Sequence, residues 1–282
     1  MKIKKLNPYI LPTILLLMLY SCGIAYAGTT TTVTLGHRAY AKYLPTTPVS
    51  PMPLVVVMHP GLSNATAWQG NAPDAAQPGL ANTMDGEAEQ HGFAVMYLNG
   101  IGRVSGFNTW DARDGKCCGF AMQRHSRDLE YIKRAITDMS QTEDIDENRI
   151  YFAGYSNGAM MAQSFACKYQ NDVDGMVLAA GPLMLDYDEC NGFDTGNDFP
   201  DIPVTYIYGT VDTTVPPTGG VGVADATIFP ATDDIIAYRS TSGATQTVYP
   251  LVGANHAWND IVTFLSSQEG LVFASVTGDL AD

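Results

Sequence analysis

Short, nearly continuous runs of apolar and β-branched residues recur along this chain. Such runs are typical of strands that are buried on both faces of a parallel sheet, because neither face is left to polar side chains. The pattern predicts strands at residues 54–58, 93–98, 150–153, 176–180 and 204–208. It predicts helices at residues 124–140, 159–169 and 261–266, the first of which carries apolar residues at helical spacing.

The alternation of predicted strands and helices indicates an α/β fold. Right-handed crossovers between parallel strands would build a doubly wound, mostly parallel sheet with helices on both faces. Ligands of such folds bind beyond the carboxyl ends of the strands. The sequence contains no internal repeat and no linker to a second module, and its Gly- and Pro-rich stretch at 216–222 is short enough for a surface loop. We therefore expect a single domain at residues 28–282.

Residues 1–27 have the layout of a secretory signal. Three lysines precede an apolar run at residues 14–20, and Ala25-Tyr26-Ala27 stands before Gly28 as a cleavage site. The apolar run is shorter than the roughly 20 residues of a membrane-spanning helix, so we expect no stable span after processing. Cys22 offers a rival lipoprotein processing site. The protein is thus expected to be secreted or periplasmic, with lipid anchoring at Cys22 as the alternative.

Acidic residues outnumber basic ones by 29 to 15, which gives a formal net charge of −14. Removal of the three lysines of the signal changes this net charge to −17. A surface of this charge repels nucleic acids and anionic membranes. We therefore expect a soluble monomer whose partners are small or oligomeric substrates.

Four cysteines remain beyond the signal: Cys117, Cys118, Cys167 and Cys190. An even number of cysteines in an exported protein predicts two disulfides, for which three pairings are possible. A bridge between the adjacent Cys117 and Cys118 would close a small, strained ring. We therefore expect each of these two residues to pair separately with Cys167 or Cys190. No histidine pair or CxxC motif accompanies the cysteines, so we expect no metal site.

The segment Gly154-Tyr155-Ser156-Asn157-Gly158 matches the G-x-S-x-G motif, with a predicted strand before it and a predicted helix after it. This is the arrangement of a nucleophile elbow, in which a serine occupies a strained turn and two glycines let the strand and the helix approach closely. The helix N-terminus then offers N–H groups to negative charge. The context predicts that Ser156 is a nucleophile rather than a helix-capping serine.

A nucleophilic serine needs a base and a group that orients the base. In this arrangement the acid follows the serine along the chain and the histidine comes last. His256 is the only histidine after Ser156, so we predict that it is the base. Asp212, just beyond the strand at 204–208, is the predicted acid. Its rivals lie in the preceding loop: Asp186, Asp188 and Asp194.

Acyl transfer also needs two donors for the developing oxyanion. The N–H of Asn157, the residue after the nucleophile, is the first predicted donor. The second donor is expected in the loop after the strand at 54–58, where Pro60 has no N–H to give. Gly61 is the preferred residue and Leu62 is the alternative.

The three tryptophans are candidates for lining a subsite for an acyl or aromatic group: Trp68, Trp110 and Trp258. Trp258 lies two residues past the predicted base. Aromatic residues equally serve the core of a protein, which is the competing interpretation. The remaining histidines precede the serine and are interpreted as structural: His37, His59, His91 and His125.

Five segments resemble one family of enzymes in their order and approximate spacing: MHPGLSNATAW, WDARDGKCCGFA, RIYFAGYSNGAMMAQSFAC, YIYGTVDTTVP and GANHAW. This family is the polyhydroxybutyrate depolymerase-like esterases, which merges with the bacterial feruloyl and acetyl xylan esterases. The resemblance implies the α/β-hydrolase fold and a triad of Ser156, Asp212 and His256. The chain departs from the family at His59-Pro60, where His-Gly is usual, and at Arg127-Asp128, where two acidic residues are usual.

The sequence therefore predicts a secreted serine carboxylic ester hydrolase, of the EC 3.1.1 type, that works through an acyl-enzyme and needs no cofactor. Feruloyl, acetyl and short hydroxyalkanoate esters are the expected substrates. A peptidase of the same fold is the first alternative. A non-catalytic binding protein on a hydrolase scaffold is the second alternative, although such proteins usually lose a residue of the triad.

Overall fold

The computed structural model of the chain describes residues 28–69, 81–112, 117–185, 190, 199–222, 227–257, 259–261 and 264. The predicted signal at 1–27, with Cys22, lies outside these residues, and so does most of the helix predicted at 261–266. Within the described part of the chain, no helix is both long enough and apolar enough to span a membrane.

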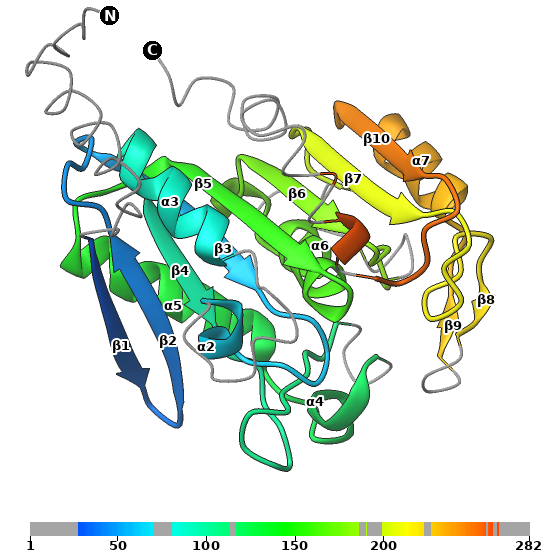
Figure 1. Cartoon of the computed structure of the whole chain (residues 1–282), viewed down its shortest axis with the longest axis horizontal. Helices are drawn as coiled ribbons and strands as arrows, with labels where there is room; N and C mark the ends of the chain where they lie inside the picture. The colour runs from blue at the N-terminus through cyan, green and yellow to red at the C-terminus, as the bar shows by residue number, and fades with distance from the viewer. Residues whose placement is uncertain are drawn as a thin grey trace, which may run out of the picture.

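Eight strands of the described residues form a central sheet, with the strand order β1-β2-β4-β3-β5-β6-β7-β10 (Figure 1). Its strands are β1 (Thr29–Leu35), β2 (Arg38–Leu44), β3 (Met52–Met58), β4 (Ala94–Leu98), β5 (Ile145–Tyr155), β6 (Gly175–Ala179), β7 (Val204–Gly209) and β10 (Gln246–Leu251). The pairs β1–β2 and β2–β4 are antiparallel, and the other pairs are parallel. Strands β8 (Gly220–Val221) and β9 (Ile228–Phe229) pair separately. The predicted α/β fold with a mostly parallel sheet is thus confirmed.

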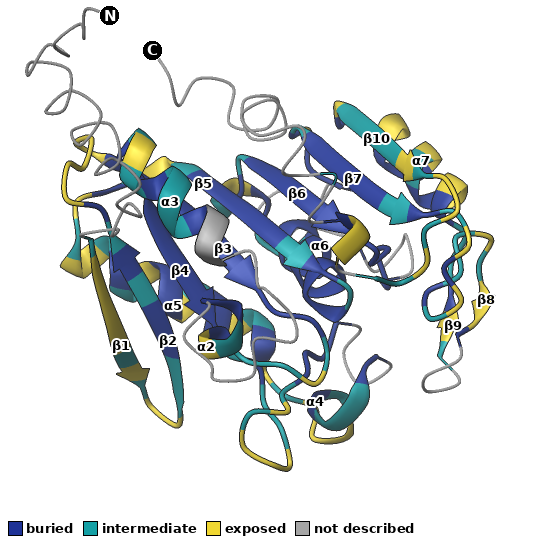
Figure 2. Ribbon diagram, in the orientation of Figure 1, coloured by how far each residue is buried: buried dark blue, intermediate teal, exposed yellow. Residues whose placement is uncertain are grey.

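All five predicted strands are present, as β3, β4, β5, β6 and β7. Most of their residues are buried, as expected for strands covered on both faces (Figure 2). The sequence pattern missed the other three strands of the sheet, β1, β2 and β10, of which β1 is rich in threonine and mostly exposed at the edge of the sheet (Figure 2). Threonine favours strands, but β1 carries no apolar run that marks it as one.

Helices cover both faces of the sheet, with α3 in front of it and α5 and α6 behind it in Figure 1. The helices with described bounds are α2 (Ala65–Trp68), α3 (Ala81–His91), α4 (Gly119–Gln123), α5 (Asp128–Thr142), α6 (Asn157–Lys168), α7 (Thr232–Thr241) and the 3-10 turn η1 (Gln170–Asp172). Val56 of β3 belongs to the apolar cluster under α5 and α6, whereas Val57 belongs to the cluster under α2 and α3. Successive residues of β3 therefore point into two separate apolar layers.

Helix α5 begins at Asp128, four residues later than predicted, and Asp128 ties it to the sheet. The buried carboxylate accepts hydrogen bonds from Arg38 Nη1 at 2.5 Å, from the Asp111 N–H at 2.7 Å and from Ser126 Oγ at 2.6 Å. The Arg38 guanidinium also lies 3.6 Å from the centroid of the Tyr131 ring. Charge-assisted hydrogen bonds of this kind are strong. They hold β2, the loop after β4 and the start of α5 together.

The disulfides join Cys167 to Cys190 and Cys117 to Cys118. The expectation that Cys117 and Cys118 pair separately with the two more distant cysteines is therefore wrong. The Cα atom of Cys167, near the end of α6, lies 4.9 Å from that of Cys190, which is within the range that a bridge spans. Cys117 and Cys118 are then left to each other, and each sulfur lies 4.0 Å from Met160 Sδ of α6.

Loss of the Cys167–Cys190 bridge should lower the free energy of unfolding by about 3 kcal/mol, because the bridge restricts a loop of the unfolded chain. The loop has a sequence separation of 23 residues. Chemical denaturation of a variant with both Cys167→Ala and Cys190→Ala measures this loss. The matched control carries Cys117→Ala and Cys118→Ala, whose bridge has a sequence separation of 1, and it should lose clearly less. Equal losses in the two double variants would contradict the loop-closure account.

Candidate active site

Ser156 occupies the turn between β5 and α6 at φ +53° and ψ −124°, a backbone conformation that residues other than glycine rarely adopt. Its N–H donates to the Ala179 carbonyl of β6 at 2.8 Å, which holds the strained turn in place. Glycine is required on both sides for lack of space. A Cβ on Gly158 would lie 2.2 Å from the Met58 carbonyl oxygen, and one on Gly154 would lie 2.7 Å from the backbone of α6.

The structure brings Ser156, Asp212 and His256 together, and we refer to these three residues as the triad. His256 Nε2 lies 2.9 Å from Ser156 Oγ, and His256 Nδ1 lies 2.6 Å from Asp212 Oδ2. Because a carboxylate can only accept, Nδ1 carries a proton and donates it to Asp212. Nε2 of the neutral ring is then the acceptor for the hydroxyl proton of Ser156. The arrangement allows the imidazole to take this proton directly.

Backbone groups hold the other two triad residues in place. Asp212 is buried after β7, and its Oδ1 accepts hydrogen bonds of 2.8 Å from the N–H groups two and three residues further on. Asn255 joins the two loops, because its Oδ1 accepts from the Thr213 N–H at 3.0 Å and from the His256 N–H at 2.8 Å. The His256 ring stacks on Tyr155, with ring centroids 5.2 Å apart. The imidazole is therefore oriented from its edge and from its face.

The two predicted oxyanion loops lie side by side. Asn157 is the first residue of α6, where the N–H groups of a helix have no intrahelical acceptor. Gly61 faces it, since a Cβ on Gly61 would lie 3.7 Å from Asn157 Cβ. Leu62 has φ +62° and is 70% exposed. The structure thus brings Gly61 and Asn157 together next to the serine, and their role as oxyanion donors stays a prediction.

Two of the tryptophans expected to line the site are interior residues instead. Trp110 is completely buried, its Nε1–H donates to the His59 carbonyl at 2.9 Å, and its backbone pairs with the side-chain amide of Asn157. Trp68 is 3% exposed and packs near Tyr155, with ring centroids 6.0 Å apart. A side chain with almost no exposed surface cannot contact a substrate. The lining prediction is therefore wrong for both residues, which support the site from within.

Other sequence predictions fall outside the described residues. They concern Trp258 as a lining residue and the rival acids Asp186, Asp188 and Asp194. In the part of the chain that the structure describes, no group of three or more His, Cys, Asp or Glu side chains could hold a metal ion.

His59 is interpreted from the sequence as a structural histidine, and the structure places it directly under the loop of Gly61. It is completely buried at the end of β3, and its ring packs on Trp110 with centroids 4.9 Å apart. Burial lowers the pKa of His59 to about 4, so the ring is neutral at neutral pH. Its position next to Pro60 was the only signal in the sequence, and that signal does not distinguish a core residue from a residue of the site.

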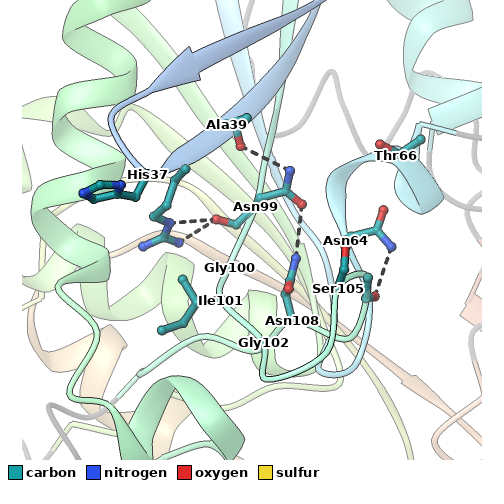
Figure 3. Close-up of a pocket in the computed structure, with 12 residues that line it drawn as sticks. His37, Ala39, Asn64, Thr66, Asn99, Gly100, Ile101, Gly102, Ser105 and Asn108 are labelled. Carbon is teal, nitrogen blue, oxygen red and sulfur yellow. Dashed lines mark hydrogen bonds between the residues drawn. The ribbon is translucent and has the colours of Figure 1, made fainter.

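A polar pocket of about 420 Å³ lies beside the same loop (Figure 3). Three asparagine side chains face it: Asn64, Asn99 and Asn108. Asn64 Nδ2 donates to the Gly106 carbonyl at 3.1 Å, and Asn108 Nδ2 donates to Asn99 Oδ1 at 3.4 Å. A backbone bridge between Ser63 and Asn108 connects the pocket wall to the loop of Gly61. The described residues that line this pocket include none of the triad.

Comparison with known proteins finds similarity to esterases and to a polyester depolymerase. A family profile described as phospholipase/carboxylesterase matches residues 122–228. The chain is 28% identical over 150 residues to a poly(3-hydroxybutyrate) depolymerase of Ralstonia pickettii. This alignment covers 52% of this chain and 29% of that protein. It is 25% identical over 171 residues to feruloyl esterase B of Piromyces equi, in an alignment that covers 60% of this chain and 28% of that protein. The chain thus spans less than a third of the length of these two relatives.

Solved structures share the arrangement of the elements. The acetyl xylan esterase from Aspergillus awamori matches with a TM-score of 0.57 and 14% identity, over 81% of this chain and 94% of that one. The ferulic acid esterase from Anaeromyces mucronatus, solved in complex with ferulic acid, matches with a TM-score of 0.59 and 12% identity, over 92% of each chain. The chain has the α/β-hydrolase fold. The resemblance of this α/β-hydrolase chain to the polyhydroxybutyrate depolymerase-like and feruloyl esterases is confirmed by the curated relatives.

Gly158→Ala should lower the free energy of unfolding of this α/β-hydrolase chain by about 1–3 kcal/mol, because overpacking forces backbone shifts. The new Cβ would lie 2.2 Å from the Met58 carbonyl oxygen and 2.6 Å from that of His59. Gly61→Ala is the control, because a Cβ there meets no atom closer than 3.7 Å, and its stability should change little. Denaturant titrations of both variants test the difference. Equal stability of the two variants would mean that α6 can move away from β3 at no cost.

Proposed function

We propose that this protein is a secreted serine carboxylic ester hydrolase that works through an acyl-enzyme. The observation that carries the proposal is the pair of hydrogen bonds from Ser156 Oγ to His256 Nε2 at 2.9 Å and from His256 Nδ1 to Asp212 at 2.6 Å. A serine between two glycines occurs by chance. A connected serine, imidazole and buried carboxylate has one main chemical use, which is to activate the hydroxyl as a nucleophile.

In the proposed mechanism Ser156 is the nucleophile, His256 transfers protons and Asp212 orients the imidazole. Ser156 Oγ attacks the ester carbonyl carbon while its proton moves to His256 Nε2, and the carbonyl π-electron pair moves onto the oxygen. Asp212 stabilises the imidazolium and keeps the other proton on Nδ1. Collapse of the tetrahedral intermediate expels the alcohol, which takes the proton from Nε2 and leaves an acyl-serine. Water then attacks in the same way and releases the carboxylic acid.

The N–H groups of Asn157 and Gly61 are the proposed donors to the oxyanion. The start of α6 favours negative charge, since the first N–H groups of a helix point toward it without acceptors of their own. We prefer Gly61 to Leu62 because Gly61 is the residue that faces Asn157. Donors fixed before the reaction stabilise developing charge without a cost of reorganisation.

The proposed substrates are feruloyl, acetyl and short hydroxyalkanoate esters, outside the cell that makes the protein. The relatives of this chain include proteins named as an acetylxylan esterase, a poly(3-hydroxybutyrate) depolymerase and a feruloyl esterase, and these names support the three substrate classes. The disulfides and the signal-like residues 1–27 support export to an oxidising compartment. Initial rates on methyl ferulate, acetylated xylan and polyhydroxybutyrate films rank the classes. Cleavage of peptide anilides without ester turnover would favour a peptidase.

Ser156→Ala should reduce kcat/KM on p-nitrophenyl acetate by about 10⁴- to 10⁶-fold, because loss of a triad nucleophile costs factors of this order. The fold should survive, as circular dichroism and the unfolding midpoint can verify, because the substitution removes one hydroxyl. Purified wild type and variant are compared at equal concentration. A variant that keeps more than about a tenth of the wild-type rate would show that Ser156 is not the nucleophile.

Asp212→Asn should slow the same reaction by up to about 10⁴-fold, because a neutral amide neither stabilises the imidazolium nor fixes the required tautomer. The variant should fold, since asparagine Oδ1 can still accept the two backbone N–H groups that bind Asp212 Oδ1. The controls are the rival acids, in the variants Asp186→Asn, Asp188→Asn and Asp194→Asn, which should change kcat/KM little. The opposite ranking would assign the orienting acid to the loop after β6.

A further inference from the structure

His59 is a buried imidazole that the proposed reaction does not use. It has no exposed surface, and it directly precedes Pro60 and Gly61 in the proposed oxyanion loop. Polar atoms buried in this way need hydrogen-bond partners, because an unsatisfied one carries its full desolvation cost. Both ring nitrogens of His59 have such a partner.

The partners of His59 fix where its proton lies. The Gly100 N–H donates to Nε2 at 2.9 Å, and Nδ1 lies 2.7 Å from the Pro60 carbonyl oxygen. A backbone N–H can only donate, so Nε2 is the acceptor and carries no proton. Nδ1 therefore carries the proton and donates it to Pro60. A neutral ring with its proton on Nδ1 satisfies both contacts, whereas a charged ring would place a proton against the Gly100 N–H.

The hydrogen bond to Pro60 acts on the next residue through the peptide plane. The Pro60 carbonyl and the Gly61 N–H belong to one planar peptide unit, in which the C=O and N–H bonds point in opposite directions. Holding the carbonyl oxygen toward His59 therefore turns the Gly61 N–H away from His59. Gly61 faces Asn157 at the start of α6.

A second set of contacts from His59 reaches the other proposed donor. The His59 carbonyl accepts the Trp110 Nε1–H at 2.9 Å. The backbone N–H of Trp110 donates to Asn157 Oδ1 at 2.7 Å, and Asn157 Nδ2 donates to the Trp110 carbonyl at 3.0 Å. All of these groups are buried. The two proposed oxyanion donors are thus held by one connected set of hydrogen bonds that begins at His59.

We propose that His59 is a positioning residue for the oxyanion site, and that its Nδ1–H orients the Gly61 N–H toward the developing oxyanion through the Pro60 carbonyl. This inference rests on the proposed esterase function. It adds a requirement beyond the triad. The hydrogen bond that His59 donates to the Pro60 carbonyl should matter for turnover, whereas the hydrogen bond that His59 accepts from the Gly100 N–H should not.

Two substitutions separate these bonds. In His59→Asn the amide nitrogen takes the place of Nδ1 and can donate to Pro60, but nothing reaches Gly100. In His59→Gln the amide oxygen takes the place of Nε2 and can accept from Gly100, but the donor to Pro60 is lost. Both variants lose the same ring contact with Trp110, so a merely structural role would affect both in the same way.

We expect His59→Asn to keep kcat on p-nitrophenyl acetate within about tenfold of wild type, and His59→Gln to lose about 10²- to 10³-fold in kcat with little change in KM. A trifluoromethyl ketone binds serine hydrolases as an oxyanion adduct, and its inhibition constant should increase in His59→Gln by a similar factor. Unfolding midpoints are measured for both variants. Equal kcat in the two variants, or losses that follow the unfolding midpoints, would overturn the proposal.

A measurement on the wild type does not depend on the folding of a variant. Nitrogen NMR of the histidine rings should show one ring that is protonated on Nδ1 only and that stays neutral at pH 5, in keeping with the lowered pKa of His59. A His59 ring protonated on Nε2, or charged at that pH, would overturn the proposal. Activity in Ser156→Ala would instead overturn the proposed function, so the two failures are distinguishable.

Discussion

The close approach of α6 to the end of β3 is the constraint on which the site depends. Gly158 allows the helix backbone to lie directly against the carbonyl groups of Met58 and His59, where no other side chain fits. This approach brings Asn157 next to Gly61 and leaves Ser156 at a positive φ between strand and helix. Strain of this kind costs about 1–3 kcal/mol and persists only where the surroundings impose it. Here strands buried on both faces impose it.

Two residues of the triad, Asp212 and His256, are held mainly by uncharged groups. Asp212 takes two backbone N–H groups on the oxygen that does not contact His256, and Asn255 joins the loops of both residues. Backbone donors and amides of this kind keep a fixed orientation and do not change their charge with pH. A site built in this way needs little reorganisation when negative charge develops on the substrate oxygen and the imidazole takes up the serine proton.

The sequence predicted what depends on local pattern. The five central strands are apolar runs, and the elbow at Ser156 is a short motif whose glycines answer a local steric need. What depends on contacts between distant segments could not be predicted. Trp110 is an interior residue whose backbone meets the Asn157 amide, and Cys190, although it follows β6 in the chain, pairs with Cys167 near the end of α6. The local sequence around these residues would be the same whether or not these contacts formed, so it carries no information about them.

The position of β10 at the edge of the sheet determines how the triad can come apart. Among the described residues β10 pairs only with β7, at the edge of the sheet, and it is only partly buried. His256 follows this edge strand, whereas Ser156 and Asp212 follow β5 and β7 in the interior of the sheet. Edge elements with few buried contacts open at a lower free energy than the whole molecule does. Release of one strand can therefore separate the imidazole from its two partners while seven strands remain paired, and inactivation then reports a local event.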